Sequence, residues 1–111
     1  MGHPYFGEWV LMLKGASAYD EKSEAIAVNP SYSQSVQLHW GPGARDGEVV
    51  IECADSKHFN GTWAELGRKP CPGSNTQEIY EHNGPCVFIR TRITKAIIGG
   101  TITTKLQMMV G

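Results

Sequence analysis

The stretch Thr-Ile-Thr-Thr-Lys-Leu-Gln-Met-Met-Val, residues 101–110, decides the fold class. Every second residue of this stretch is apolar or small enough to be buried, and most of the residues between them are polar. The first set is Ile102, Thr104, Leu106, Met108 and Val110. A period of two is typical of an antiparallel strand with one face on a core and the other in solvent. The stretch therefore predicts a β-strand that packs on a hydrophobic core.

Seven other segments carry strand signals. Alternation of period two is clear in four of them, and the other three are shorter. The seven segments are 9–13, 25–28, 36–40, 49–53, 62–66, 78–81 and 87–94. Turn-forming residues separate most of them, at 29–30, 41–43, 46–47, 60–61, 69–73 and 83–85. Among these, Asp46-Gly47, Asn60-Gly61 and Asn83-Gly84 predict tight turns that need positive φ.

The chain shows no sign of a long helix. Residues 16–27 include helix formers without a long apolar stripe, which predicts a loop or a short helical turn. Short strands in close succession, separated by turns, are typical of β-sandwiches and jelly rolls. We therefore predict an all-β fold. It is a single antiparallel β-sandwich, jelly-roll-like, of about eight strands, in one domain that spans residues 1–111.

The chain is small, sparsely charged and nearly neutral. Its 111 residues suffice for one domain, and 10 basic and 11 acidic residues give a net charge of -1. Nucleic-acid affinity comes largely from clustered Lys and Arg, so no nucleic-acid partner is predicted. The longest apolar run, 9–13, is too short to span a membrane, and the N-terminus lacks a secretory signal pattern. We therefore expect a protein that is made in the cytoplasm and has no membrane partner.

The residues form no recognisable catalytic constellation. The serines include no Gly-x-Ser-x-Gly elbow, and the four histidines include no His-Glu-x-x-His pair. The loop 41–47 lacks the Lys-Ser or Lys-Thr that a phosphate-binding loop needs after its glycines. Carboxylates such as Glu52 and Glu65 form no pattern beyond what any small domain offers. We therefore predict that the protein is not an enzyme and uses no cofactor.

The three cysteines are Cys53, Cys71 and Cys86. An odd count without a secretory signal is not typical of a disulfide framework. No Cys-x-x-Cys spacing is present, so the cysteines do not suggest a zinc site. We expect buried or half-buried thiols and no metal. Whether the cysteines pair in a particle outside the reducing cell stays open at this point.

Aromatic residues support an alternative interpretation. The segment 55–63 predicts a β-turn whose Trp63 packs into the sandwich. Tyr5, Tyr19, Tyr32 and Tyr80 lie near predicted strand ends or loops. Exposed aromatic rings of small β-sandwiches can stack on sugars, although packing at an edge or an interface is their more common role. A carbohydrate-binding or host-surface adhesion module is therefore an alternative.

The last forty residues carry a pattern that resembles a known family. Residues 80–93, Tyr-Glu-His-Asn-Gly-Pro-Cys-Val-Phe-Ile-Arg-Thr-Arg-Ile, are followed at 97–106 by Ile-Ile-Gly-Gly-Thr-Ile-Thr-Thr-Lys-Leu. This arrangement is similar to small β-sandwich proteins of tailed bacteriophages, and residues 61–66 fit the same layout. With the length and the all-β pattern, the chain resembles the head-decoration (staple or cement) proteins of epsilon-fifteen-like short-tailed phages.

The resemblance implies a structural role without catalytic residues. It implies a jelly-roll-like fold on the outer surface of the virion, and a homodimer that staples neighbouring major capsid subunits and stabilises the shell against DNA pressure. A different phage structural β-sandwich, such as a tail component, is a further alternative to the head-decoration protein.

Six side chains are candidate interface residues. Tyr5 and Phe6 lie in residues 1–7, which we interpret as an extended docking arm. Phe88, Arg90 and Arg92 share one strand face, where the arginines either pair with capsid carboxylates or are simply solvated. Met109 lies on an outward face, where it either contacts a dimer mate or is simply exposed.

Overall fold

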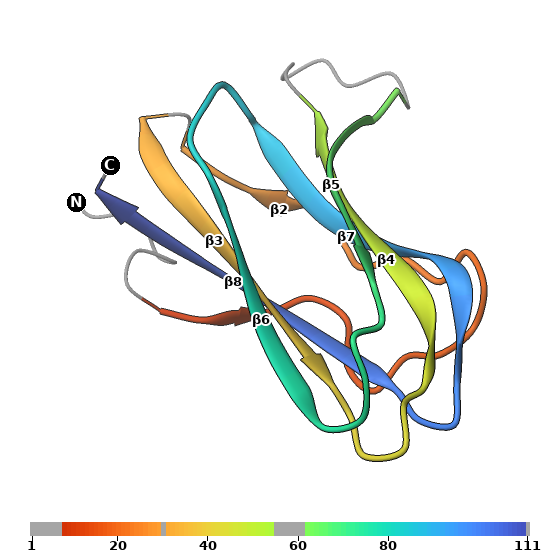
Figure 1. The fold of residues 1–111 in the computed structure, drawn as a ribbon. Helices are drawn as coiled ribbons and strands as arrows, with labels where there is room; N and C mark the ends of the chain where they lie inside the picture. Colours follow the sequence, from red (N-terminus) through yellow and green to blue (C-terminus); the bar gives the residue numbers. More distant parts are fainter. Residues whose placement is uncertain (1–7, 30, 55–61, 111) are drawn as a thin grey trace.

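The computed structural model describes residues 8–29, 31–54 and 62–110 (Figure 1). These residues form eight strands in two packed four-stranded antiparallel sheets. The strands are β1 (Val10–Leu11), β2 (Ile26–Ala27), β3 (Tyr32–Trp40), β4 (Asp46–Ala54), β5 (Ala64–Pro70), β6 (Thr76–His82), β7 (Phe88–Ile98) and β8 (Ile102–Val110). The predicted β-sandwich is confirmed, and each of the eight predicted segments overlaps one strand.

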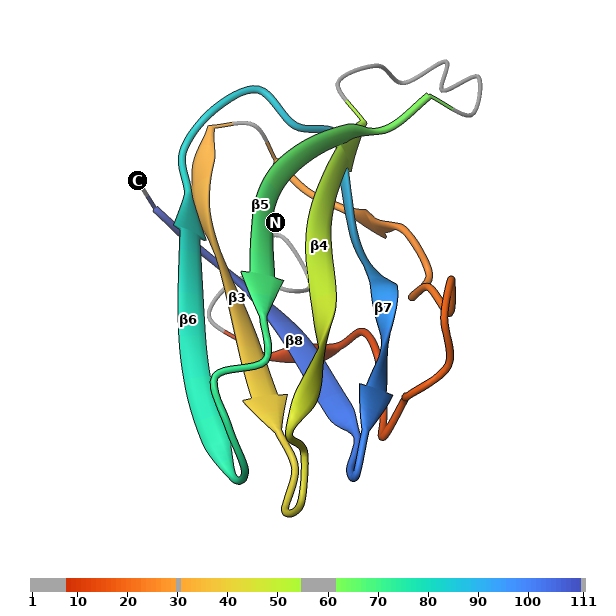
Figure 2. The same cartoon turned by 45° about the vertical axis from the view of Figure 1, so that its right-hand side comes forward.

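The strand order is nested. Sheet A has the order β1-β8-β3-β6, and sheet B has the order β2-β7-β4-β5. The first strand thus pairs with the last, the second with the seventh, the third with the sixth and the fourth with the fifth. A chain folded back on itself and wrapped in this way has the strand order of a jelly roll. Figure 2 shows the two sheets packed face to face, with β3 and β8 of sheet A passing behind β4 and β5 of sheet B.

The hydrophobic core lies between the two sheets. Alternation in β3, β7 and β8 points the expected residues inward, which confirms the period-two pattern. The fully buried large side chains include Leu38, Trp40, Ile51, Ile89, Ile93, Leu106 and Met108. Strand β4 departs from the pattern, because its outward residues Val50, Glu52 and Ala54 are also buried. In register, Val50 lies between Arg68 of β5 and Arg92 of β7, whose long side chains shield this part of the sheet.

One predicted turn is wrong. Asp46 and Gly47 lie inside β4, and the connection from β3 to β4 comes earlier, at residues 41–45. The pairing of β4 with β7 shifts between Asp46 and Glu48, which marks a β-bulge. Gly47 has a φ of 128°, and a Cβ there would meet the side chain of Ile97 at 2.5 Å. The positive φ that suggested a turn serves this bulge instead.

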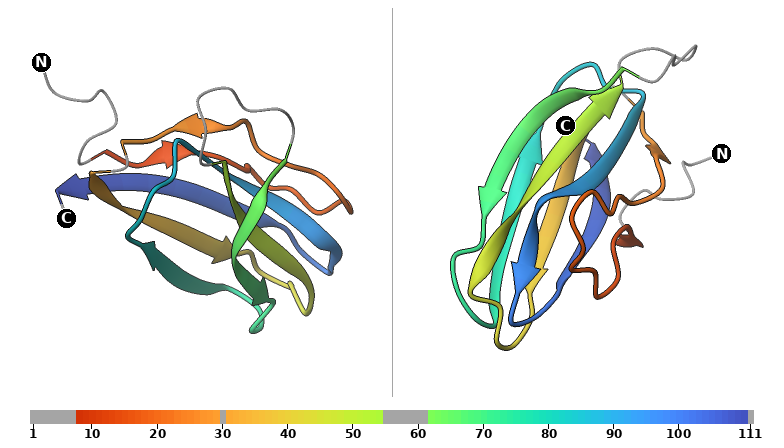
Figure 3. Two further views of the ribbon diagram at one scale, coloured as in Figure 1. Left: turned by 90° about the horizontal axis from the view of Figure 1, so that it is seen from above. Right: turned by 90° about the vertical axis from the view of Figure 1, so that its right-hand side faces the viewer.

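Residues 16–25 form a loop without a helical turn, and residues 26–27 form β2. The backbone of the loop bonds to the edge of β7: the N–H of Asp20 donates to the carbonyl of Ile93 at 2.8 Å, and that of Ser23 to Thr91 at 2.9 Å. A bridge between Ala16 and Ile102 ties its start to β8. In the right-hand view of Figure 3, the red and orange segment runs along the edge of β7.

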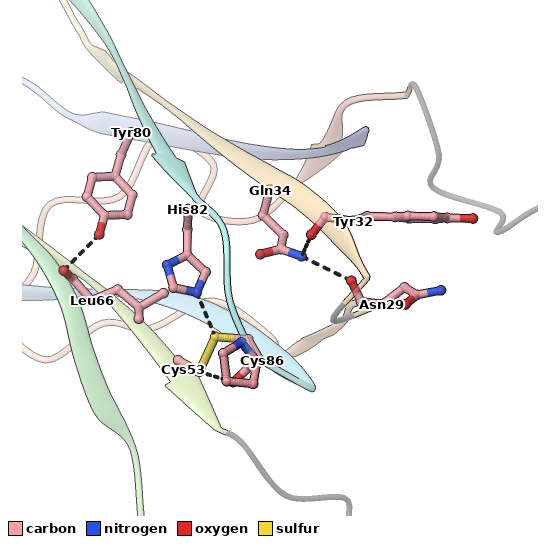
Figure 4. The surroundings of a disulfide bond; sticks show 9 residues. Asn29, Tyr32, Gln34, Cys53, Leu66, Tyr80, His82 and Cys86 are labelled. Carbon is pink, nitrogen blue, oxygen red and sulfur yellow. Dashed lines mark hydrogen bonds between the residues drawn. A yellow bond between two sulfur atoms is a disulfide. The ribbon is translucent and has the colours of Figure 1, made fainter. Parts of the chain in front are cut away.

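The expectation of free thiols is wrong for two of the three cysteines. Cys53, near the end of β4, and Cys86, in the connection from β6 to β7, form a disulfide with a Cα–Cα distance of 5.7 Å (Figure 4). The fold brings them together at one end of the sandwich, although 33 positions separate them in sequence. Cys71 is a half-buried free cysteine, as predicted.

Candidate functional site

The outer face of sheet B carries a network of charged side chains centred on Glu52. The carboxylate of Glu52 is buried and accepts a hydrogen bond from Arg90 Nε at 2.9 Å. It also accepts bonds from Nε and Nη2 of Arg92, each at 3.3 Å. Two guanidinium groups therefore compensate one buried carboxylate, which is the condition under which a buried charge is tolerated.

Trp63 extends this network. The guanidinium carbon of Arg90 lies 4.2 Å from the centre of the Trp63 ring, which is a cation–π contact. The indole was expected inside the sandwich, but it is half-buried on the outer face of sheet B. Trp63 precedes the first residue of β5, so the alternation of that strand does not place its side chain. Its ring stacks instead on the flat guanidinium group of Arg90. The predicted turn at 60–61 lies outside the described residues.

Arg92 also contacts Asp20 of the loop that borders β7. Its Nη1 donates to Asp20 at 3.2 Å. Lys22, and then the hydrogen bond from Arg92, lower the pKa of the Asp20 carboxyl. The hydrogen bonds to Glu52 raise the pKa of Arg92. These contacts favour the charged form of Arg92 and tie the loop to the sheet.

A second charged cluster lies further along the same face. Glu48 accepts a hydrogen bond from the Thr94 hydroxyl at 2.7 Å and pairs with Arg68, which also bonds to Glu65. The bond from Thr94, followed by that from Arg68, lowers the pKa of Glu48. Most charges on this face therefore have partners within the chain.

The predicted strand face of Phe88, Arg90 and Arg92 exists as expected. Phe88 is half-buried and lies between Ala27 and Ala54 in register. Both arginines bond to carboxylates of their own chain, an outcome that neither alternative for them had included. These bonds within the chain occupy part of each guanidinium group, so fewer of its N–H donors are left for the carboxylates of a partner protein.

The outer face of sheet A is different, because uncharged side chains dominate it. Three rows cross β8, β3 and β6: Thr103–His39–Gln77, Lys105–Gln37–Ile79 and Gln107–Ser35–Glu81. Only two of these nine residues, Lys105 and Glu81, are charged at neutral pH. Uncharged polar side chains cost less to desolvate than charged ones, although each still needs a hydrogen-bond partner when it is covered.

Three large apolar side chains are exposed along the β1/β8 edge of sheet A. Trp9 is 39% exposed, Leu11 46% and Met109 42%; we call them the β1/β8 apolar patch. Leu11 lies opposite Lys105, whose side chain belongs to the outer face. Met109 lies four residues after Lys105 on β8, so its side chain is on the same outer face, as predicted. Leu13 has the same spacing as Trp9 and Leu11 but is buried, because β1 is only two residues long and Leu13 lies beyond the regular strand.

The six predicted interface residues do not form one site. Met109 lies on the outer face of sheet A, whereas Phe88, Arg90 and Arg92 lie on the outer face of sheet B. Tyr5, Phe6 and the whole predicted docking arm 1–7 lie outside the described residues. The sequence did not reveal that Glu52 pairs with both arginines, that Trp63 stacks on Arg90, or that Ile79 is exposed on the outer face of sheet A. For Ile79 a signal existed, because it is the one apolar outward residue in the alternation of 76–82.

The disulfide end of the sandwich is a third cluster. His82 Nε2 lies 3.4 Å from Cys86 Sγ, and Gln34 donates from Nε2 to the carbonyls of Asn29 at 3.1 Å and Tyr32 at 2.6 Å (Figure 4). Gln34 Oε1 is the one buried side-chain oxygen without a partner in the described part of the chain. Because both half-cystines are buried, this cluster stabilises the end of the fold and presents no exposed sulfur to a substrate.

Residues 8–29, 31–54 and 62–110 hold no group of three or more His, Cys, Asp or Glu side chains placed to bind a metal ion. They also hold no helix long and apolar enough to cross a membrane. Comparison of the chain with models of known protein families, with curated proteins and with solved structures finds no match.

Proposed function

We propose that this protein is a structural component of a bacteriophage particle. It binds the outer surface of the phage head and, as a dimer, staples neighbouring major capsid subunits, which stabilises the shell against DNA pressure. The observation that carries the proposal is the β1/β8 apolar patch beside a nearly uncharged sheet face. A protein that binds only the assembled shell stabilises it by mass action, without any bond chemistry.

The patch has the composition of a protein-binding surface. Aromatic residues and Met are enriched at protein interfaces, where Lys and Glu are depleted. Trp9, Leu11 and Met109 supply three large side chains that are each about two-fifths exposed. Burying such side chains contributes roughly 25 cal/mol per Å² of apolar surface. The patch therefore offers a partner hydrophobic contact at little electrostatic cost.

The predicted docking arm is continuous with the patch. Residues 1–7 end two positions before Trp9, so Tyr5 and Phe6 would extend the same aromatic contact onto a capsid subunit. Phe88, Arg90 and Arg92 lie on the other sheet, and the arginines already have carboxylate partners. We therefore assign the main capsid contact to the arm and the patch. The jelly-roll strand order supports the resemblance to phage decoration proteins, although the same architecture hosts many functions.

Retention on purified heads tests the proposal. Undecorated capsids are mixed with the purified chain and sedimented; the wild-type protein should sediment with them. Leu11→Lys and Met109→Lys should each abolish or strongly reduce retention. Ile98→Lys is the matched control, because Ile98 is also an exposed apolar residue (41%) but lies at the end of β7. If the wild-type chain stays in the supernatant, the proposed function is wrong.

A carbohydrate-binding or adhesion module is the second candidate. It is favoured by the exposed Trp9 ring, which lies one residue before the Val10–Leu106 pair, while Gln107 follows that pair on β8. An aromatic face next to an amide suits a sugar ring and its hydroxyls. Such a protein would give a signal on a glycan array that Trp9→Ala removes and Met109→Lys leaves intact. Binding to purified tails, and not to heads, would favour a tail component.

A further inference from the structure

We propose that strand β6 of one copy pairs antiparallel with β6 of a second copy, centred on Ile79. The two copies of sheet A then form one continuous eight-stranded sheet. This inference deepens the proposed function by naming the surface of its dimer. It depends on that function only for the use of the dimer, because the pairing itself is measured without capsids.

The chain protects most of its sheet edges against pairing with another strand. An edge strand exposes unpaired N–H and C=O groups, and proteins shield such edges with short strands, bulges, prolines and charged side chains. The two packed sheets have four edges, formed by β1, β2, β5 and β6. Strands β1 and β2 are two residues long, so neither offers a partner a usable row of backbone groups.

Strand β5 carries several protective features. Its pairing with β4 shifts between Ile51 and Glu52, so that Leu66 is the extra residue of a bulge. Arg68 and Lys69 put positive charges on the strand, and Pro70 removes a backbone donor at its end. Another strand would meet an irregular and charged edge here.

Strand β6 has no bulge, no proline and no positive charge, and its charged residues are Glu78 and Glu81. All of its residues, Thr76 to His82, pair with β3 in seven consecutive steps without a register shift. The strand contains no Lys, Arg, Pro or Gly. In Figure 2 it forms the outer left border of sheet A, and no other described strand pairs with its far side. It is therefore the one long edge of the described sandwich that is regular and free of bulges and prolines.

The side chains of β6 complement a second copy of the same strand. Ile79 is the middle residue of the strand and is 52% exposed. In an antiparallel pair centred there, Ile79 lies opposite Ile79 of the second copy, and Gln77 lies opposite the second copy's Glu81. The amide of Gln77 can then donate to that carboxylate, twice by symmetry. On the inner face, Glu78 lies opposite Tyr80 and Thr76 opposite His82, so no like charges face each other directly.

The strand is also held rigid from behind. The Tyr80 hydroxyl donates to the carbonyl of Leu66 at 2.8 Å, and Glu78 accepts a bond from Trp40 Nε1 at 3.0 Å. A Cβ at Gly67 would meet the Tyr80 ring at 2.7 Å, so the ring packs directly against β5. A preorganised edge pays little ordering entropy when it binds.

The pairing would also place the capsid contacts favourably. β6 and β1 are the opposite edges of sheet A, so the two β1/β8 apolar patches lie at the far ends of the joined sheet. A dimer with two linked contacts binds far more tightly than one contact alone.

Sedimentation velocity of the purified chain over a concentration series tests the pairing. The wild-type protein should move from monomer to dimer as the concentration rises. Ile79→Lys should raise the dimer dissociation constant at least about tenfold, because it puts two like charges opposite each other. Ile98→Lys changes an exposed isoleucine outside β6 and should leave dimerisation unchanged. A wild-type chain that remains monomeric, or equal effects of the two substitutions, would overturn the proposal.

Charge substitutions at Gln77 test the register and do not rely on Ile79. Gln77→Lys places an ammonium opposite Glu81 of the second copy and should strengthen the dimer. Gln77→Glu places two carboxylates there and should weaken it. Gln77 is exposed, so both variants should fold, and thermal unfolding of the monomer checks this. Equal effects of the two substitutions would exclude the register.

The two proposals fail separately. A monomer that is still retained on capsids overturns the β6 pairing and the dimeric stapling, but leaves the proposed capsid binding in place. A dimer that is not retained on capsids overturns only the proposed function.

Discussion

Thr91 of β7 and Thr104 of β8 are hydrogen-bonded across the two sheets, with 2.7 Å between their hydroxyl oxygens. Both residues are fully buried. Thr104 Oγ1 also accepts a bond from the N–H of Leu13 at 3.0 Å, and the N–H of Thr91 donates to Ser23 Oγ at 3.0 Å. This polar bridge inside the core ties the irregular N-terminal segment to both sheets.

The first prediction concerns this bridge. Thr104→Val should lower the free energy of unfolding by about 1–3 kcal/mol, because it leaves the buried N–H of Leu13 without an acceptor. Thr91→Val should cost less, about 1 kcal/mol, because Leu13 keeps its acceptor. Urea unfolding measures both values, and amide hydrogen exchange should show faster exchange at Leu13 in Thr104→Val only. Equal stability of Thr104→Val and the wild type would contradict this account.

The second prediction concerns the disulfide. Cross-linking positions 33 apart removes chain entropy from the unfolded state, which stabilises the fold by about 3–4 kcal/mol. The double variant Cys53→Ala/Cys86→Ala should therefore unfold at a lower urea concentration than the oxidised wild type. It should also lose the dependence of that midpoint on a reducing agent.

Cys71→Ala is the control for the disulfide prediction. Cys71 is the free cysteine, so this variant should respond to a reducing agent as the wild type does. If adding the reducing agent leaves the wild-type midpoint unchanged, the bond contributes no stability in solution.

How far the sequence predicts the fold depends on the signal that each element carries. Period-two alternation predicts five of the eight strands, because a strand with one buried face must alternate, and shorter segments bounded by turn residues predict β2, β5 and β6. Alternation is silent on the disulfide, since only the three-dimensional nesting brings Cys53 and Cys86 together. Equal spacing does not put Trp9, Leu11 and Leu13 on one face either, because β1 has only two residues. Asp46-Gly47 wrongly predicted a turn, because a glycine with positive φ suits both a tight turn and the β-bulge at Gly47.

Surface residues are harder to predict than the core. The alternation placed Arg90 and Arg92 on one face correctly, but their carboxylate partner Glu52 lies 40 and 38 positions away from Arg92 and Arg90. Pairs so far apart depend on the register between strands, which local patterns do not contain. The contrast between a charged sheet B and a nearly uncharged sheet A therefore emerges only from the folded chain.

The third prediction concerns acid stability. The folded-state pKa of Glu48 is lowered, first by the hydrogen bond from Thr94. A lowered carboxyl pKa gives stability that is fully present above the unfolded value, 4.5 for a glutamate, and is lost as pH falls through the folded value. Stability should therefore decline as the pH falls below about 4.5, with the exposed Asp20 and Asp46, whose pKa values are also lowered, acting in the same direction.

Two substitutions isolate the Glu48 contribution. Thr94→Val removes the hydroxyl donor and should make the decline below pH 4.5 less steep. Glu48→Gln removes the titrating group and should have at least the same effect. In the Glu48→Gln background, Thr94→Val should change the pH dependence no further. The measurement is the urea midpoint from pH 7 down to pH 3, and an unaltered slope in Thr94→Val would show that the bond does not shift the Glu48 titration.

The fourth prediction links the docking arm to the β1/β8 apolar patch. Deleting residues 2–7 removes Tyr5 and Phe6 and should lower the affinity for undecorated capsids at least about tenfold, as expected for the loss of aromatic anchors. Leu11→Lys should have a similar effect alone. If the arm and the patch contact the same capsid surface, the combined loss should be smaller than the product of the two, because neighbouring contacts are not additive. Combined with Ile98→Lys, the deletion should cause no more than its own loss. Full capsid affinity after the deletion would exclude the arm, and multiplicative losses would place the arm and the patch on independent contacts.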